Sequence, residues 1–237
     1  MSKLLAAALL ALAAGVSDLE AQRLLGVHAD ASGAALTVRI PNALAVIRET
    51  TTGAFHFRYG STSTGTWIFS GIPAGTYEMW HSAPGFEPAQ PYVLTNPVPY
   101  PASGDTWASA ALQPNTSLPK LKFQVPTTTG EITLGTSIDL ELNGQPFSSR
   151  LLFVSTAPQL PPVVLPGIGP LFALDLVAAN PFYVVDLGPG DGGGFLFSSL
   201  PVPRDPTLQG GVLFLQGLEL TQSFSLALAN LLAIRFI

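Results

Sequence analysis

Short runs of alternating apolar and polar residues, separated by clusters of Gly, Thr, Ser and Pro, fill the chain from residue 22 to residue 116. A period of two places alternate side chains on opposite faces of a β-strand. The pattern predicts strands over Ala35 to Ile40, Leu44 to Arg48, Phe55 to Tyr59, Thr66 to Ser70, Thr76 to His81 and Pro91 to Leu94. Within Thr76 to His81, Tyr77 and Met79 are expected to face the core, and Glu78 and Trp80 the opposite side. We therefore expect Trp80 to be at least partly exposed.

A second series of such runs follows residue 119. It predicts strands over Lys120 to Val125, Glu131 to Leu142, Leu151 to Ser155, Leu171 to Val177, Phe182 to Leu187, Gly194 to Leu200, Gly211 to Leu220 and Phe224 to Ile237, with a Pro-rich connection from Ala157 to Pro170. The clearest alternation is Ser137 to Asn143, where the even positions are Ile or Leu and the odd positions are polar. One face of this strand is expected to be core and the other to be wet.

The stretch from Gln113 to Pro119 concentrates turn-forming residues between the two series. All three Trp and all three His of the chain precede it. We expect a domain boundary here, with one domain over residues 22–116 and a second over residues 118–237. The predicted fold class is all-β, with two β-sandwich domains in tandem after a signal peptide.

The first residues have the features of an export signal. Lys3 precedes an apolar run from Leu4 to Val16 that is too short to span a bilayer but suits the central region of a signal peptide. Cleavage after Ser17 or after Ala21 fits the small residues nearby, and we assign residues 1–21 to the signal. The mature chain is expected to have no transmembrane segment and to be secreted or held at the cell surface. Export of a protein without cysteine favours a bacterial source.

Composition narrows the classes of function. Charged residues make up 11% of the chain, whereas an average soluble protein has about 25%. Ten Lys and Arg against 15 Asp and Glu give a net charge of −5 without a basic stripe, which argues against nucleic-acid binding. The absence of Cys excludes disulfides, thiolate catalysis and cysteine-ligated zinc. The 23 Gly and 22 Pro are too many for a helical protein.

One segment of the first series resembles a known family. The run from Gly65 to Tyr77, followed by Gly85-Phe86, resembles the carboxypeptidase regulatory-like family, a transthyretin-like β-sandwich. The alternating aromatics Trp67 and Phe69, the turn Ile72-Pro-Ala-Gly75 and then Tyr77 carry the resemblance. Independently of the family, Tyr77 is placed to bury its ring and to donate its hydroxyl to the backbone.

The second series resembles an uncharacterised terminal β-domain of secreted planctomycete-type bacterial proteins. The segments that carry this resemblance are Leu200 to Gly210, Leu215 to Leu218 and Leu226 to Leu232. The resemblance implies an extracellular location and brings no chemistry with it.

Carboxylates are the candidate chemical groups of the second domain, which contains no His. Asp139 and Glu141 lie about 7 Å apart by strand rise, a separation that inverting glycosidases use, but a solvated strand face explains them better. Asp186 and Asp191, in the loop that ends at Gly194, offer the oxygen ligands that calcium prefers. A glycine hairpin between Phe182 to Val185 and Phe195 to Ser198 explains that loop equally well.

The three histidines, His28, His56 and His81, form a metal site if strands distant in sequence bring them together. We interpret them instead as lone strand histidines, and we expect no cofactor. No nucleophile-base motif accompanies them.

Aromatic residues are the remaining candidates for ligand binding. If Trp80 is exposed, Trp80, Tyr92, Tyr100 and Trp107 would supply a platform on which a sugar ring stacks. Packing of Trp80 against the second domain is the favoured alternative, because the low charge makes large apolar contacts common.

These observations predict a non-catalytic exported module, structural or interacting, at the cell surface or in the extracellular space. The alternative is a carbohydrate-binding module that uses the platform around Trp80. Possible partners are a surface protein or a polysaccharide.

Overall fold

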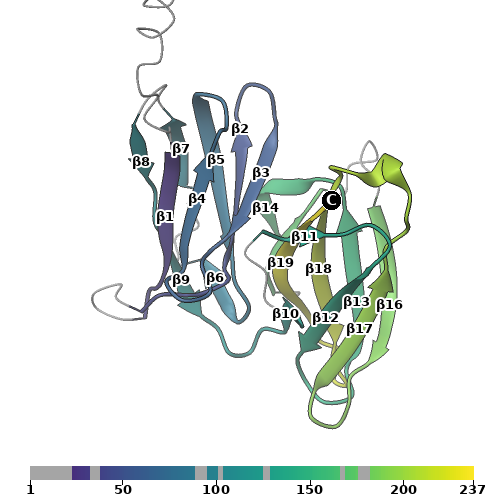
Figure 1. Ribbon diagram of the computed structural model, residues 1–237. Helices are drawn as coiled ribbons and strands as arrows, with labels where there is room; N and C mark the ends of the chain where they lie inside the picture. The colour runs from purple at the N-terminus through teal and green to yellow at the C-terminus, as the bar shows by residue number, and fades with distance from the viewer. Residues whose placement is uncertain are drawn as a thin grey trace, which may run out of the picture.

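β-strands account for almost all of the regular secondary structure (Figure 1). The computed structural model describes residues 23–32, 38–88, 95–100, 104–124, 129–165, 169–175 and 182–237. In these residues one 3₁₀ turn, η1 (Pro206–Leu208), interrupts the strands, and none of the helices is long and apolar enough to cross a membrane. The all-β prediction is confirmed. The predicted signal peptide lies outside the described residues.

The first half of the chain forms two sheets that enclose a core. One sheet has the order β4-β1-β9-β6, with β8 also paired to β1, and the other has the order β3-β2-β5-β7. Their bounds are β1 (Arg23–Asp30), β4 (Thr66–Ser70), β6 (Phe86–Pro88), β8 (Asp105–Trp107), β9 (Ala110–Pro114), β2 (Leu44–Glu49), β3 (Phe55–Tyr59), β5 (Gly75–Ser82) and β7 (Thr95–Tyr100). Trp67 and Phe69 of the first sheet pack in one buried cluster with Ile47 and Tyr77 of the second, as in a sandwich.

The second half also has two facing sheets, with the orders β10-β12-β17 and β11-β19-β18-β13-β16. Their bounds are β10 (Lys120–Phe123), β12 (Ser137–Asn143), β17 (Phe195–Pro201), β11 (Glu131–Ile132), β19 (Leu226–Phe236), β18 (Val212–Leu220), β13 (Ser149–Ser155) and β16 (Phe182–Pro189). Leu121 and Leu140 of the smaller sheet meet Leu215 and Leu228 of the larger one in a single core. A separate hairpin joins β14 (Pro158–Leu165) and β15 (Gly169–Leu174).

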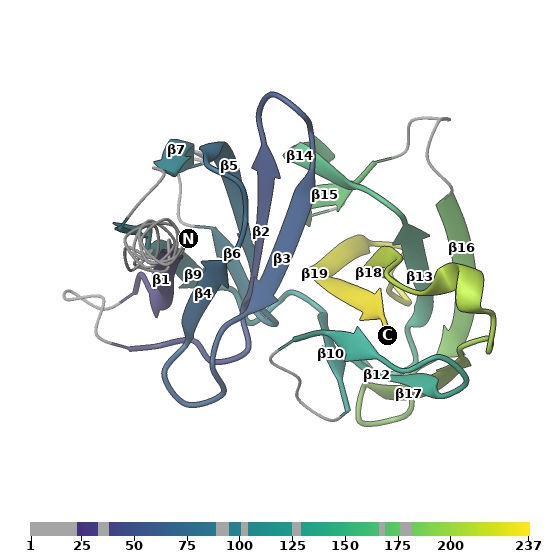
Figure 2. The same cartoon turned by 45° about the horizontal axis from the view of Figure 1, so that its top comes forward.

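Each sheet of the described chain draws its strands from one side of residues 115–119. One hydrophobic cluster, in contrast, contains buried residues from both halves. Trp80 and Phe57 of the first half belong to the same buried cluster as Leu231 and Ile234 of the second. Figures 1 and 2 show β2 and β3 of the β3-β2-β5-β7 sheet on the side of the first half that faces the second half. Independent folding of residues 22–116 and 118–237 stays a prediction.

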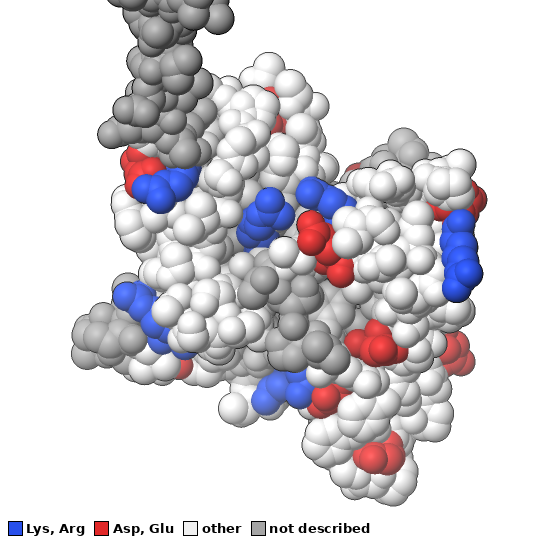
Figure 3. Space-filling model, in the orientation of Figure 1, with Lys and Arg blue, Asp and Glu red and all other residues white. Residues whose placement is uncertain are grey.

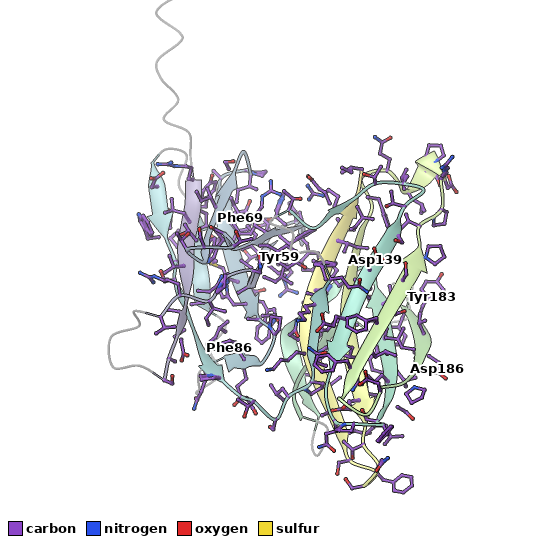
Figure 4. The ribbon with its side chains drawn as sticks, turned by 60° about the horizontal axis from the view of Figure 1, so that its bottom comes forward. Tyr59, Phe69, Phe86, Asp139, Tyr183 and Asp186 are labelled. Atoms are coloured by element: carbon purple, nitrogen blue, oxygen red, sulfur yellow. The ribbon has the colours of Figure 1, made fainter. Side chains whose placement is uncertain are left out.

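Side chains of the first half complete the hydrogen bonding of β19. The Tyr59 hydroxyl donates to the carbonyl oxygen of Ala233 (2.9 Å) and accepts from its amide nitrogen (2.8 Å). The Ser82 hydroxyl accepts from the amide of Leu231 at 2.9 Å. Figure 4 shows Tyr59 on the side of the first half that faces the second. Because these backbone groups are buried, their satisfaction by the first half stabilises the junction and covers a strand edge.

The last strand, β19, is buried on both faces over most of its length. Residues 228–234 of β19 are all buried. Its buried hydrophobic residues belong to one cluster with residues of the second half and with Trp80, Phe57 and Tyr59 of the first half.

Several predicted elements differ from the structure. The segment Ala157 to Pro170, expected as a connection, contains β14 and pairs with β15. The predicted strand Glu131 to Leu142 is split into β11 and β12, with Gly135 between them at a φ of 81°. Strand β1 was not predicted, yet it pairs with β4, β8 and β9 at the centre of its sheet.

Two predicted strands are not seen as expected in the described chain. Of Ala35 to Ile40, the described part contains a single bridge, from Arg39 to Ala29. The segment Pro91 to Leu94 lies outside the described residues.

Candidate functional site

The four predicted aromatic residues do not form one platform among the described residues. Trp80 is only 6% exposed and Tyr100 is buried, whereas Trp107 on β8 is 66% exposed. Tyr92 lies outside the described residues. The predicted exposure of Trp80 is wrong because the second half covers the outer face of β5. The predicted facing is confirmed, since Tyr77 lies in the core of the first half, on the other side of the strand.

Tyr77 behaves as its motif predicts. Its ring is fully buried, and its hydroxyl donates to the carbonyl oxygen of Pro73 at 2.8 Å. Tyr100 packs edge-on against it, with ring centroids 6.1 Å apart and planes at 87°. Tyr100 is therefore a core residue of the first half.

In the structure, the two aspartates predicted as calcium ligands accept hydrogen bonds from nearby backbone amides. The Oδ1 atom of Asp191 accepts from the amides of Gly193 (2.9 Å) and Phe195 (2.8 Å). The Oδ1 atom of Asp186 accepts from the amide of Gly188 at 2.8 Å. No group of three His, Asp or Glu suited to a metal occurs in the described part of the chain. Each carboxylate thus fixes its own turn.

The segment between these aspartates is not the hairpin that the glycines suggested. Strand β16 pairs with β13 and strand β17 with β12, so the two strands belong to different sheets. The glycine-rich turn carries the chain from one sheet to the other. Gly194 has a φ of 80°, and a Cβ there would lie 2.2 Å from the carbonyl oxygen of Gly144. Only glycine fits this close approach.

Two of the three histidines meet in the interior of the first half. The Nε2 atom of His28 and the Nδ1 atom of His81 are 2.9 Å apart, and both residues are buried. Desolvation lowers the pKa of His28 to about 4 and lowers that of His81 as well. The interpretation as lone strand histidines is wrong for this pair, because β1 and β5 bring them together from facing sheets. His56 lies instead beside Tyr77, with ring centroids 6.4 Å apart.

Exposed aromatic residues gather on β17, where the sequence analysis had placed no binding site. Phe195 is 43% and Phe197 is 60% exposed. Their ring centroids are 6.5 Å apart and their planes agree within 6°. The signal was in the sequence, since the run from Phe195 to Ser199 alternates and places both rings on one face.

The polar residues of β12 and β10 lie on the same face as the two rings. Residues directly opposite each other in an antiparallel sheet share a face. The register pairs Phe195 with Asn143 and Phe197 with Glu141, and it continues to Lys120 and Lys122 on β10. We call the outer residues of these three strands the β17 face: Phe195, Phe197, Ser199, Asp139, Glu141, Asn143, Lys120 and Lys122.

The carboxylates of the β17 face are held by their neighbours. Asp139 accepts from the hydroxyls of Ser199 (2.5 Å) and Ser137 (2.8 Å), which lower its pKa. Glu141 accepts from the Nδ2 atom of Asn143 at 2.7 Å and pairs with the ammonium of Lys122 at 2.8 Å. The prediction that this is a solvated strand face is confirmed for Asp139, which is exposed (Figure 4).

A cleft of about 400 Å³ opens at one end of the β17 face. It lies between the connection of the two halves and the turns of the second half, and its lining includes Thr116, Ser117, Asn143, Gln145 and Phe195. The Oδ1 atom of Asn143 is buried and has no donor among the described residues.

A buried ion pair binds the two turns that border the cleft. The guanidinium of Arg150 donates to the carbonyl oxygens of Gln145 (3.1 Å) and Gly194 (2.7 Å). The Oε1 atom of Glu219 lies 3.6 Å from this guanidinium and accepts from the amide of Gln145 at 2.6 Å. Both side chains are buried. The sequence analysis missed this pair, although Arg150 alternates in phase with the inward-facing Leu152.

Comparisons with known proteins give no family. No family model and no curated protein matches the chain. Three of the solved structures that resemble it are a superoxide reductase from Ignicoccus hospitalis, the major pilin SpaD from Corynebacterium diphtheriae and a tetra-tandem repeat from the extending region of a large adhesion protein. Their identities are 12%, 10% and 11%, with TM-scores of 0.27, 0.29 and 0.29.

The matches cover 51%, 92% and 91% of this chain, and 80%, 68% and 49% of the respective structures. These TM-scores are too low for the likeness to bear on the function of the site.

Proposed function

We propose that the chain is an exported, non-catalytic interaction module that acts at the cell surface or in the extracellular space through the β17 face. The observation that carries the proposal is the pair of parallel, exposed phenyl rings of Phe195 and Phe197. Exposed aromatic residues that adjoin a polar rim are typical of binding surfaces.

The surroundings of the β17 face support binding rather than catalysis. Its carboxylates are occupied by Ser hydroxyls, Lys122 and Asn143, which leaves no acid and base facing a common point. A general acid or base must lie within hydrogen-bond reach of its substrate. The buried pair of His28 and His81 is closed to a ligand by its burial.

The second half has further exposed apolar residues. Tyr183 and Val184 on β16 are exposed, as is Phe147. Figure 3 shows one face of the molecule on which the charged side chains are sparse and several Lys or Arg lie beside Asp or Glu. Binding at such a surface depends on contact more than on long-range charge, so we expect a weak response to salt.

The resemblances to the carboxypeptidase regulatory-like family and to the planctomycete-type β-domain also support this proposal. The first implies a β-sandwich and the second an extracellular location, in keeping with the predicted signal peptide at residues 1–21. Release of that peptide is tested by mass spectrometry of exported protein.

A cell-retention experiment tests the proposed function. Labelled protein from residue 22 is incubated with intact cells and envelope fragments of a planctomycete-type bacterium, and the retained fraction is measured. We expect the double variant Phe195→Ser/Phe197→Ser to lose at least 80–90% of the retention, by analogy with the loss of an interface hot spot (about 2 kcal/mol or more). The matched control is Trp107→Ser, an equally exposed aromatic on the first half, which should retain fully. Equal retention of all three proteins would refute the proposal.

A further inference from the structure

We propose that the β17 face binds a neutral saccharide chain, with one sugar unit in the cleft beside Asn143 and the next units along Phe195 and Phe197. This inference rests on the proposed function, because it names the ligand class of the same face. Three features of the site support it: the rings, the polar residues of the cleft and the balance of charge.

The two phenyl rings provide a repeated apolar contact. They follow each other along one strand, with parallel planes and centroids 6.5 Å apart. A chain of sugar units also repeats, and each unit has an apolar patch of C–H groups that packs against an aromatic ring. Phenyl rings have no polar atom, so the hydrogen bonds to sugar hydroxyls must come from other side chains.

Those hydrogen bonds are available one strand away. Asn143 lies directly opposite Phe195, and its Nδ2 atom already donates to Glu141. Asn143 also belongs to the lining of the cleft. A side-chain amide can both donate and accept hydrogen bonds, as a sugar hydroxyl does.

The cleft has the size and polarity that a sugar unit needs. Its volume of about 400 Å³ lies in the range of small-molecule sites, about 300–1,000 Å³. The hydroxyls of Thr116 and Ser117 and the amide of Gln145 line it together with Phe195. Polar groups around an aromatic wall suit a ligand whose rims carry hydroxyls.

The charges of the β17 face favour a neutral ligand. Two Lys and two acidic residues, Lys120, Lys122, Asp139 and Glu141, give a formal balance of zero. Lys122 and Glu141 neutralise each other in an ion pair. Over the face as a whole, a uronic acid or sulfated chain would find no excess of positive charge, and the charged residue in the lining of the cleft is Lys120.

The position of the cleft is held by rigid structure. Arg150 binds the carbonyl oxygens of both turns that border it, next to Asn143 and Phe195. The amides of Gly193 and Phe195 are fixed by Asp191. A site whose supports are already in place binds without a large ordering cost. A concave, preformed, hydroxyl-lined cleft favours a saccharide over a flat protein partner.

Affinity electrophoresis and a glycan array test the inference on the mature chain. The soluble probes are β-glucan, xylan, galactomannan and dextran, and the array contains neutral oligosaccharides of plant and bacterial types. We expect wild-type retardation by at least one neutral glycan, unchanged in 0.5 M NaCl. Phe197→Ala and Asn143→Ala should each raise Kd at least tenfold, whereas Trp107→Ala should leave it unchanged. Thermal melting confirms that each variant is folded, and Phe195→Ser replaces Phe197→Ala if that variant is not.

Each result decides between the two proposals. Glycan binding that neither Phe197→Ala nor Asn143→Ala weakens would overturn the assignment of the site. Retention on cells through the β17 face, without binding to any neutral glycan, would overturn the saccharide and leave the proposed function standing. Loss of that retention after protease treatment of the cells would identify a protein partner. The absence of both retention and glycan binding would overturn both proposals.

Discussion

The outer face of β5 and the outer face of β17 both carry aromatic side chains but have opposite surroundings. In each strand, aromatic side chains alternate with residues that point into a core. The second half covers Trp80 on β5, whereas Phe197 on β17 remains 60% exposed. The comparison teaches that alternation fixes the direction of a side chain but not what lies above it. What lies above is decided by how the two halves pack.

Aromatic residues on the outer strand faces have two roles in this protein: some join the two halves, and others stay exposed. Trp80, Phe57 and Tyr59 join the halves, and the Tyr59 hydroxyl completes the backbone bonding of Ala233. The exposed rings of Phe195 and Phe197 do not join the two halves in the described chain, and they are therefore available to a ligand.

The two faces should differ most in the loss of stability that follows truncation of an aromatic side chain, which we expect to be large at Trp80. We expect Trp80→Ala to destabilise the protein by about 3–5 kcal/mol, because it leaves a cavity in a core shared by both halves. Phe197→Ala, on the open face, should cost less than about 1 kcal/mol. Urea denaturation followed by circular dichroism measures both. Equal costs would show that the two faces have the same surroundings.

Replacement of Arg150 should show that the β17 face depends on the buried ion pair beneath it. Arg150→Met leaves the Glu219 carboxylate buried without its cation, and we expect a loss of about 3–5 kcal/mol. The double variant Arg150→Met/Glu219→Leu should recover part of this loss. The midpoints of chemical denaturation test the order. A single variant as stable as wild type would contradict the role of the pair.

Acid should weaken the first half before the second. In the folded state the pKa of His28 is lowered to about 4 and that of His81 is also lowered, whereas unfolded His titrates near 6.5. Stability is thus complete above about pH 6.5 and falls as the unfolded chain takes up protons. Between pH 7.5 and pH 5, His28 alone should account for a loss of about 2 kcal/mol.

Intrinsic fluorescence can follow this loss, since all three Trp and all three His lie in the first half. His81→Asn should reduce the pH dependence. His56→Gln should reduce it as well, because desolvation and the nearby Arg235 and Arg58 also lower the pKa of His56. A denaturation midpoint that stays constant from pH 7.5 to pH 5 would contradict the buried neutral pair.

Local pattern predicted much of the fold. The bounds of β3 and β4 agree with the predicted strands, and the two faces of β12 and β5 are as expected. Strand β1 was missed because its polar residues, Arg23, His28 and Asp30, interrupt the alternation. Its pairing with β4, β8 and β9 is non-local, and propensity does not contain that information.

The candidate site was less predictable than the fold. The Phe-Leu-Phe alternation was visible, but its exposure depends on the absence of a third layer over β17, which the run itself does not specify. The support that Arg150 gives to the cleft comes from a contact with Gly194, 44 residues further along the chain. The Asp191 carboxylate shows the same limit, since a calcium ligand and a turn-fixing acceptor have the same residue type.

Hydroxyl-radical footprinting of the mature protein, with and without cell envelope, tests the contrast between the two faces most directly. In the free protein we expect oxidation of Phe195, Phe197 and Trp107 and protection of Trp80. On the envelope, Phe195 and Phe197 should become protected while Trp107 stays reactive. Oxidation of Trp80 at the rate of Trp107, or protection of Trp107 with Phe195 and Phe197 unchanged, would contradict the account.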